Sequence, residues 1–316
     1  MKKLKAISLY SGADNLGDGL FQAGHEVIMA VEYYPKHPAF SKDACATIKE
    51  NHPDTEVICK PVSEVLSTLP KCDILIGGPP CPEFSRANPD RKYDLCEVNN
   101  FNKAREITGA KHHIMENVQD INKVYKERNF LINSADYGVP QTRIRRIFTD
   151  LELPLPSHAE HPSDRLFGDP LKKWISVKEA LNLDGVIEDR SNTFKEESYR
   201  QYSTDTPSHT ITCDVRDWYI SSSGFKSGRD VGTTKKIDEP CYTVTCADDI
   251  ILSNYTNKQR FNDDKQQRKL TNEELAIIQG FRKDFKFVGT KTNIKRMIGN
   301  AVPSQISKAF MEYNFS

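Results

Sequence analysis

The amino-acid sequence predicts an α/β fold, with a doubly wound parallel sheet and a second, smaller and mostly β region. Three observations predict it. Short runs rich in Ile, Val and Leu alternate with amphipathic stretches through the first half of the chain. Near residue 151 the composition changes to a proline-rich link, and a Ser/Thr-rich region with strand-like runs follows it. Strands that alternate with helical patterns build βαβ units, and these units form a parallel sheet.

The first half of the chain contains four expected strands. They span 6–10, 27–31, 73–76 and 113–115, and helical patterns end at Gly24 and span 39–50. An open α/β sheet binds ligands outside the carboxyl ends of its strands. The residues that follow these strands are Ser11, Gly12, Glu32, the segment 77–81, Glu116 and Asn117. One crevice should therefore hold a thiol and two carboxylates.

The second half of the chain has a different character. Its proline-rich link contains Pro154, Pro156, Pro162 and Pro170. Such a link is typical of a domain boundary. Beyond it, the segments 206–213 and 239–246 share an alternation around Thr, which indicates either two similar strands or plain strand composition. The final segment, 271–316, returns to helical periodicity, interrupted at Gly299.

Composition limits the class of protein. Charged residues make up 28% and hydrophobic residues 37% of the chain, which is typical of a globular protein. No apolar run reaches bilayer length and no leader pattern follows the basic N-terminus, so we expect a cytoplasmic protein without membrane contact. Lys plus Arg equals Asp plus Glu at 44 each, so any contact with nucleic acid must be a local basic patch. The eight cysteines include no CxxC pair, and we expect no metal site.

Cys81 stands in the most informative stretch of the sequence. It lies directly between Pro80 and Pro82, after Gly77, Gly78 and Pro79. Prolines fix φ and remove backbone donors, so this loop presents the thiol from a stiffened backbone at the end of a strand. A cysteine considered alone is more often a small buried apolar side chain. Its place in the crevice favours a nucleophile instead.

Six segments resemble, in order, the motifs of the cytosine-5 DNA methyltransferases. They are 8–24, 77–85, 116–118, 136–146, 268–281 and 299–303. The fourth reads Asp-Tyr-Gly-Val-Pro-Gln-Thr-Arg-Ile-Arg-Arg, close to the motif of that family. The resemblance spans nearly the whole chain. It implies a Rossmann-like doubly wound catalytic domain made of 1–172 and 285–316, and a smaller, mostly β target-recognition domain with a hinge at 173–284.

The resemblance assigns a role to each residue of the crevice. Carbon 5 of cytosine is too weak a nucleophile to take a methyl group directly, so the Cys81 thiolate first adds to carbon 6. Glu116 is expected to bind the base at N3 and its amino group. Arg145 is expected to hold the O2 oxygen and to favour the thiolate, with Arg143 as the weaker candidate for the same role. The target base must be flipped out of the duplex.

The resemblance also implies S-adenosylmethionine as the cofactor. The residues expected to bind it are Tyr10, Ser11, Gly12, Asp14, Asn15, Leu16, Glu32, Val62, Pro79, Asn300 and Ala301. The chain departs from the family where Asp14-Asn15 replaces two glycines, where Lys60-Pro61 replaces an adenine-binding Asp, and where Pro82 replaces Gln. The first two departures touch the cofactor pocket. Ordinary drift explains them, and weaker binding or another donor is the alternative.

Double-stranded DNA is the partner that the resemblance implies. The residues expected to contact it are Ser85, Arg86, Arg91, Lys92, Gln141, Lys226 and Arg229. The segment 82–95 looks like the family's mobile loop that closes over DNA, and an ordinary polar surface loop is the alternative. We further expect a monomer, with a restriction endonuclease as a candidate cognate partner. The recognised base sequence does not follow from residue types alone.

Three other functions compete with this hypothesis. A methyltransferase-like module that binds nucleic acid without catalysis would have no need for Cys81, Glu116 and Arg145 together. An RNA cytosine methyltransferase is disfavoured by the size of the middle region. A dinucleotide-dependent oxidoreductase would share the parallel sheet and Glu32, but Gly12, Gly17 and Gly19 lack the spacing of its fingerprint.

Overall fold

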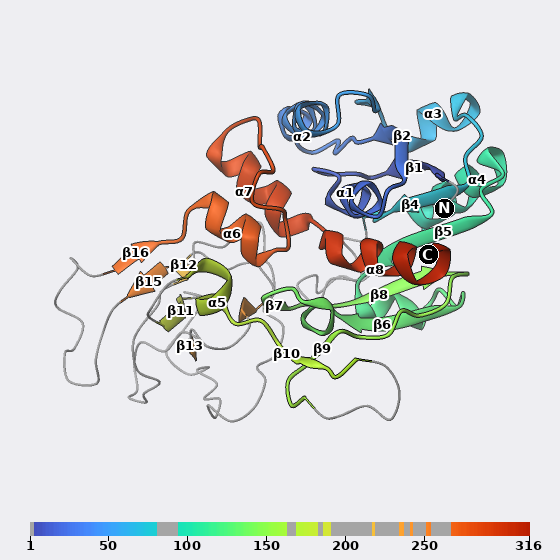
Figure 1. Ribbon diagram of the computed structural model, residues 1–316. Coiled ribbons are helices and arrows are strands. Elements are labelled where there is room, and N and C mark those ends of the chain that lie inside the picture. Colours follow the sequence, from blue (N-terminus) through green and yellow to red (C-terminus); the bar gives the residue numbers. More distant parts are fainter. Residues whose placement is uncertain are drawn as a thin grey trace.

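A seven-stranded sheet forms the centre of the molecule (Figure 1). The computed structural model describes residues 3–80, 94–162, 169–182 and 270–316, and the backbone of six short strands between 186 and 269. The sheet has the order β3-β2-β1-β4-β5-β8-β6. Its strands are β1 (Lys5–Leu9), β2 (Glu26–Val31), β3 (Glu56–Ile58), β4 (Ile74–Gly77), β5 (His112–Asn117), β6 (Asn129–Asn133) and β8 (Ile144–Thr149). Strands β1 to β5 are parallel, whereas β8 runs antiparallel to both β5 and β6.

Helices cover both faces of this sheet because its strands are apolar on both sides. On one face, Leu75 of β4 packs in a cluster with residues of α3 (Val62–Val65) and α4 (Cys96–Thr108). On the other face, Ile74 and Ile76 pack with residues of α1 (Asn15–Gln22) and α8 (Ser304–Phe315). Alternate side chains of a strand point to opposite faces, so a strand buried on both faces has a continuous apolar sequence. The Rossmann-like fold class is confirmed.

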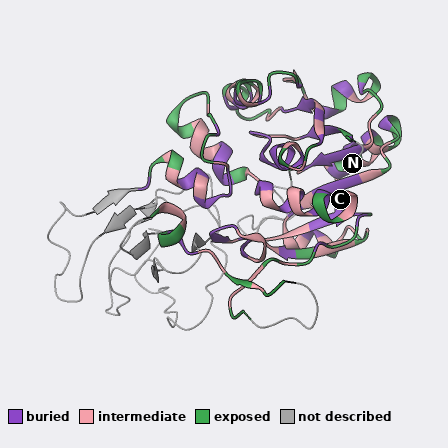
Figure 2. Ribbon diagram, in the orientation of Figure 1, coloured by how far each residue is buried: buried purple, intermediate pink, exposed green. Residues whose placement is uncertain are grey.

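The two ends of the chain are packed together through α1 and α8. Gly19 of α1 lies so close to α8 that a Cβ atom there would be 2.1 Å from Ser307 Oγ and 2.2 Å from the Ser304 carbonyl oxygen. The Ser307 hydroxyl also donates to the Leu16 carbonyl oxygen at 2.6 Å. The C-terminal segment therefore completes the layer that begins with α1, and its burial is visible in Figure 2.

A third apolar cluster joins α2 to three helices from the second half of the chain. It contains Phe40 and Ala44 of α2 (Pro38–Asn51) and Val177 of α5 (Val177–Leu181). It also contains Leu275 of α6 (Asn272–Ile278) and Met297 of α7 (Lys291–Asn300). Helix α6 begins with a capping box, in which Thr271 and Glu274 each accept the other's backbone N–H. Helices α5 and α6 fall within the expected target-recognition domain of 173–284, but they pack against α2 and α7, which belong to the expected catalytic domain. The expected domain limits stay a prediction.

The described residues between 186 and 269 all lie in strands. They are β11 (Val186–Arg190), β12 (Asp217–Trp218), β13 (Thr234–Lys236), β14 (Cys241–Tyr242), β15 (Ile251–Ser253) and β16 (Gln267–Lys269). Strands β12, β13 and β15 each pair antiparallel with β11, and β16 pairs with β15. Strand β14 belongs to the expected Thr-rich segment 239–246, whereas the segment 206–213 lies outside the described residues.

Shorter elements complete the described chain. They are the 3-10 helices η1 (Leu66–Thr68), η2 (Gln119–Lys123) and η3 (Ser134–Tyr137), and the strands β7 (Gln141–Thr142), β9 (His158–Ala159) and β10 (Lys172–Lys173). Strand β7 pairs with β14, so the middle region returns to the segment that carries Gln141. No helix in the described ranges is long and apolar enough to span a membrane.

Candidate active site

The chain turns sharply where β1 ends, and this turn lies at the carboxyl edge of the sheet, where the sequence predicts the crevice. Tyr10, Gly12 and Asp14 all have left-handed backbone, with φ of 55°, 57° and 59°. The Ser11 hydroxyl lies 3.0 Å from the Ser8 carbonyl oxygen and 3.2 Å from the Val31 carbonyl oxygen. Left-handed conformations cost free energy in residues other than glycine, so a fixed turn of this kind must be held by its surroundings.

Glu32 faces this turn from the carboxyl end of β2. Its side chain is buried, with 6% of the residue exposed, and Oε2 accepts the Gly12 N–H at 2.8 Å. Burial raises the pKa of Glu32 to about 7, although the Gly12 N–H acts in the opposite direction. In the described part of the chain this is the single hydrogen bond of its carboxyl group. Glu32 therefore keeps acceptor capacity for hydroxyl groups of a ligand.

Asp14 is turned away from open space and caps α1. Its Oδ1 lies 2.6 Å from Ser8 Oγ and accepts the Gly17 N–H at 3.3 Å, and only 1% of the residue is exposed. Burial raises the pKa of Asp14 to about 7, against the opposing effect of the Ser8 hydroxyl. Asp and Asn tolerate left-handed backbone better than other residues, so Asp14 can replace glycine here. The structure thus supports a role in the turn for Asp14, and a direct cofactor contact stays a prediction.

The segment 300–302 lies against the start of α1. Asn15 Nδ2 donates to the Val302 carbonyl oxygen at 3.0 Å, and Gln279 Nε2 donates to the Ala301 carbonyl oxygen at 2.7 Å. Leu16 packs in the sheet core and Asn300 is exposed. The structure therefore places the segment that contains Ala301 at the start of α1, and the cofactor contacts of Asn15, Asn300 and Ala301 stay predictions.

Val62 and Pro79 are both buried beside the crevice strands. Val62 is 4% exposed, begins α3, and packs in the cluster that contains Leu9 and Val31. Pro61 precedes it at the cap of α3, and Lys60 is exposed. The adenine-binding Asp that the resemblance leads one to expect is thus replaced by the apolar ring of Pro61 and the solvent-exposed side chain of Lys60.

Glu116 and Arg145 form an ion pair at the carboxyl end of β5. Glu116 Oε1 lies 3.1 Å from Arg145 Nε, and the two side chains are 12% and 18% exposed. Glu116 is positioned by β5, and Arg145 by the antiparallel strand β8. A Cβ atom on Gly78 would lie 3.3 Å from Glu116 Oε2, so the chain passes beside this carboxylate three residues before Cys81. The candidate base-binding pair is therefore adjacent to the segment that leads to the thiol.

Cys81 itself lies outside the described residues. So do Ser85, Arg86, Arg91 and Lys92 of the following loop, and Lys226 and Arg229 of the middle region. Their roles stay predictions. The described ranges contain no group of three or more His, Cys, Asp or Glu side chains that could hold a metal ion.

Asn117 follows the candidate catalytic acid Glu116, and the motif alone gives it no role. Its Nδ2 donates to the Pro79 carbonyl oxygen at 3.1 Å, and its Oδ1 accepts the Val118 N–H at 2.8 Å. The amide thus ties the proline-rich segment to the end of β5. The sequence signal for this role was an Asn directly after a candidate catalytic acid.

Comparison with known proteins decides the family. A family model described as C-5 cytosine-specific DNA methylase matches residues 4–132 and 98–314. The chain belongs to this family. It is a DNA (cytosine-5)-methyltransferase, and the expected enzyme class is confirmed.

Relatives and solved structures agree with this family. The type II methyltransferase M1.HphI of Haemophilus parahaemolyticus is 27% identical over 98% of this chain and 86% of its own length. M.FnuDI of Fusobacterium nucleatum, another type II methyltransferase, is 28% identical over 96% of this chain and 92% of its own length. A crystal structure of a DNA modification methyltransferase encoded within an E. coli prophage has a TM-score of 0.61 at 21% identity and covers 98% of each chain. That structure supports the fold.

Two polar residues of the segment 136–146 are buried in this enzyme. Gln141 is 0% exposed and donates from Nε2 to Gln279 Oε1 at 2.7 Å. Arg143 is 4% exposed and donates from Nη1 to the Gly299 carbonyl oxygen at 3.3 Å. The structure does not support a DNA contact by Gln141 or a base contact by Arg143, because both side chains bind the C-terminal segment inside the protein.

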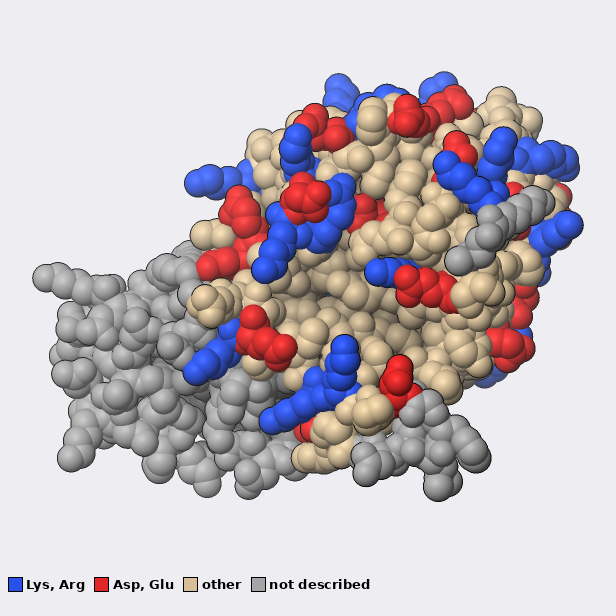
Figure 3. Space-filling model, viewed as in Figure 1, with Lys and Arg blue, Asp and Glu red and all other residues tan. Residues whose placement is uncertain are grey.

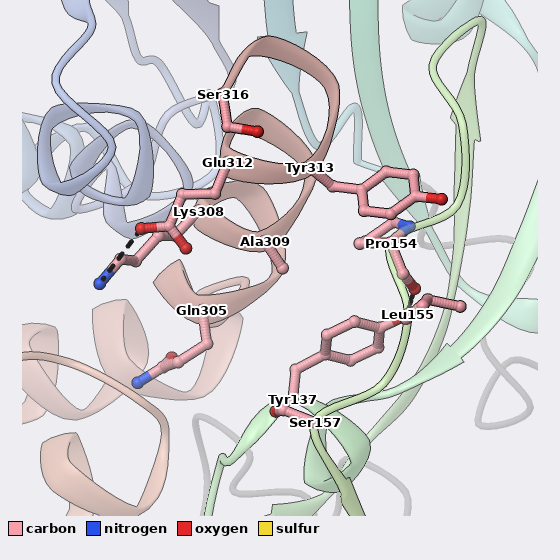
Figure 4. A pocket seen from close by; sticks show the side chains of 10 residues that line it. All are labelled: Tyr137, Pro154, Leu155, Ser157, Gln305, Lys308, Ala309, Glu312, Tyr313 and Ser316. Atoms are coloured by element: carbon pink, nitrogen blue, oxygen red, sulfur yellow. Dashed lines mark hydrogen bonds and ion pairs between the residues drawn. The ribbon is translucent and has the colours of Figure 1, made fainter. Parts of the chain in front are cut away.

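A groove of about 640 Å³ lies between α8 and the segment 154–157 (Figure 4). Its lining includes Tyr137, Leu155, Lys308 and Tyr313, and it shares no residue with the methylase crevice. On the face drawn in Figure 3, acidic and basic side chains are interspersed, as the balanced charge leads one to expect.

Proposed function

We propose that the enzyme transfers a methyl group from S-adenosylmethionine to carbon 5 of a cytosine flipped out of double-stranded DNA. Cys81 forms the covalent bond to the base. The observation that carries this proposal is the Glu116–Arg145 pair, with 3.1 Å between Glu116 Oε1 and Arg145 Nε. The pair lies beside Gly78, and Cys81 follows three residues later. The carboxyl and guanidinium groups thus lie at the strand end from which the chain continues to Cys81, and ligands of an open α/β sheet bind at such strand ends.

The reaction uses these groups in sequence. The Cys81 thiolate adds to carbon 6, and the electron pair of the 5,6 double bond moves toward carbon 5. Glu116 holds N3 and the amino group, and Arg145 holds O2, so charge that develops on the ring is stabilised. When bound, S-adenosylmethionine supplies the electrophilic methyl group that carbon 5 takes up. Loss of the carbon-5 proton to a base such as water then releases Cys81 as thiolate and restores the double bond.

The residues at the ends of β1 and β2 fit this cofactor. Glu32 is buried and holds one hydrogen bond, so its carboxyl group can accept from ribose hydroxyls. The Asp14 carboxyl group is turned toward Ser8 and Gly17, so it adds no charge to open space in the crevice. Ordinary S-adenosylmethionine is thus compatible with the departures from the family pattern. Calorimetric titration tests this, and an absence of binding at millimolar cofactor would exclude it as the donor.

The covalent step is tested with DNA that contains 5-fluorocytosine. Fluorine cannot leave as a cation, so the protein should stay bonded to the base after methyl transfer. We expect a denaturation-resistant adduct with the wild type and with Cys96→Ser, a control at an exposed cysteine outside the crevice. Cys81→Ser should form none. An adduct with Cys81→Ser, or none with a wild type that binds S-adenosylmethionine, would refute the role of Cys81.

We also propose that the enzyme belongs to a restriction-modification system. The relatives M1.HphI and M.FnuDI are type II methyltransferases, which supports a modification enzyme with a cognate restriction endonuclease. We propose that it acts as a monomer in the cytoplasm. The division into a catalytic domain of 1–172 with 285–316 and a target-recognition domain of 173–284 is part of this proposal.

A further inference from the structure

Tyr10 connects the cofactor turn to the first turn of α4. Its hydroxyl donates to Glu97 and lies 2.7 Å from Oε2 and 3.1 Å from the backbone carbonyl oxygen of Glu97. Asn100 Nδ2 supports the same carboxylate at 3.3 Å from Oε2. The ring of Tyr10 packs in the apolar cluster that contains Val98, with Leu95 beside it. Two elements far apart in sequence are thus joined through one hydroxyl group.

The backbone of Tyr10 has an unfavourable conformation that this contact can stabilise. Its φ of 55° is left-handed, and an aromatic residue adopts that conformation only when its surroundings hold it. Tyr10 also stands two residues before Gly12, whose N–H binds Glu32. If the ring of Tyr10 is released, the turn that presents Gly12 loses its fixed form.

Glu97 lies in the first turn of α4, whose described residues begin shortly after the segment that carries Cys81. Helix α4 is firmly packed, because Phe101 and Ala104 are fully buried against the sheet. The carboxylate therefore stands on a rigid support, and Tyr10 is the side chain that it holds.

We propose that Glu97 is a positioning residue that sets the affinity for S-adenosylmethionine by holding Tyr10 in its left-handed conformation. This inference rests on the proposed cofactor. The turn is then preformed, and binding does not have to order it. Without the contact, only the fraction of molecules with the correct turn binds, and the apparent affinity falls by that fraction.

The test measures the Kd of S-adenosylhomocysteine by calorimetry, together with the unfolding temperature of each variant without ligand. Tyr10→Phe keeps the ring and removes the hydroxyl. We expect its Kd to rise by roughly tenfold, as does that of Glu97→Ala, because a hydrogen bond to a charged group is lost. Glu97→Gln keeps an acceptor oxygen and should retain affinity within about threefold. The double variant Y10F/E97A should bind no more weakly than either single variant.

The matched control is Tyr125→Phe. The Tyr125 hydroxyl also binds a glutamate, Glu127, and neither residue belongs to the crevice. This variant should show the wild-type Kd even if its unfolding temperature falls, which separates positioning from general stability. A Tyr10→Phe Kd within twofold of the wild type, or single losses that multiply in the double variant, would overturn the inference. A wild type that binds no S-adenosylhomocysteine would overturn the proposed cofactor and this inference with it.

Discussion

Asp14 replaces a glycine of the family's turn, and its buried carboxyl group makes the free energy of unfolding depend on pH. Its folded-state pKa is about 7, whereas the ordinary value is 3.8. Between these values the folded protein holds a proton that the unfolded chain has released. Stability from this group is therefore full below about pH 4 and is lost as the pH rises toward 7.

The first prediction is that Asp14→Asn removes this dependence. The amide keeps an acceptor for Ser8 Oγ and does not titrate. The free energy of unfolding of the variant minus that of the wild type should increase by at least about 1 kcal/mol as the pH rises from 4 to 7. Urea denaturation at stepped pH values measures this. Asp54→Asn, at an exposed position, is the control, and parallel pH curves for Asp14→Asn and the wild type would contradict the prediction.

The second prediction concerns Asn117. Asn117→Asp keeps the shape but replaces the Nδ2 donor by an oxygen, so the hydrogen bond to the Pro79 carbonyl is lost. Because this bond ties the Cys81 segment to β5, we expect the rate of methyl transfer at saturating cofactor to fall by about 10- to 100-fold. The Kd for S-adenosylhomocysteine should not change. An unaltered rate would show that Asn117 has no positioning role.

At the scale of elements, α1 and α8 determine how the two chain ends join. Their close approach depends on Gly19, because any Cβ atom there would collide with Ser307 and with the backbone of Ser304. The backbone atom cannot rotate away, so one of the helices has to move.

The third prediction is that Gly19→Ala lowers the free energy of unfolding by about 2 kcal/mol or more, although alanine is the better helix former. Chemical denaturation measures the loss. Glu106→Ala, at an exposed position of α4, should stay within about 0.5 kcal/mol of the wild type. A Gly19→Ala protein as stable as the wild type would show that α1 and α8 are less tightly packed than described.

The strands β5 and β8 are linked by a charged cluster at the end of the sheet opposite the crevice. His113 lies 2.9 Å from Asp150 and 3.3 Å from Glu127, and its side chain is 4% exposed. Burial acts to lower the pKa of His113, but hydrogen bonds to Asp150 and Glu127 outweigh it and raise the pKa above its ordinary value. The charged histidine therefore stabilises the fold at low pH.

The fourth prediction follows from the sign of that shift. The contribution of His113 is complete below the ordinary histidine pKa and is lost as the pH rises through the raised one. The free energy of unfolding of His113→Gln should thus be lower than that of the wild type by on the order of 1 kcal/mol at pH 6, and by less at pH 9. Thermal unfolding across this range measures the difference. His161→Gln, at an exposed position, is the control, and an equal loss at both pH values would contradict the prediction.

At the scale of the whole molecule, the apolar runs of the first half predicted β1, β2, β4 and β5. The reason is that buried parallel strands have a distinctive composition. The same runs also predicted that residues after these strands lie close together, as the contact of Gly12 with Glu32 shows. The pairing of β8 with β5 and β6 did not follow from composition, since antiparallel order at a sheet edge depends on the path of the chain.

Side-chain roles that depend on long-range contacts were also beyond the sequence. The sequence predicted a DNA contact for Gln141, whereas its side chain is buried against Gln279, which lies 138 positions away in the chain. The capping of α1 by Asp14 and the contact of Tyr10 with Glu97 likewise require coordinates. Motif order identified Glu116 and Arg145, but only the fold shows that they meet.

The central claim is that Cys81 makes this chain a cytosine-5 methyltransferase of DNA. Bisulfite sequencing of DNA from cells that express the chain tests it most directly. We expect cytosines protected from conversion at one short recurring sequence with the wild type and with Cys96→Ser, and at none with Cys81→Ser. Protection that persists in Cys81→Ser would contradict the account, as would complete conversion in cells that contain folded wild-type protein.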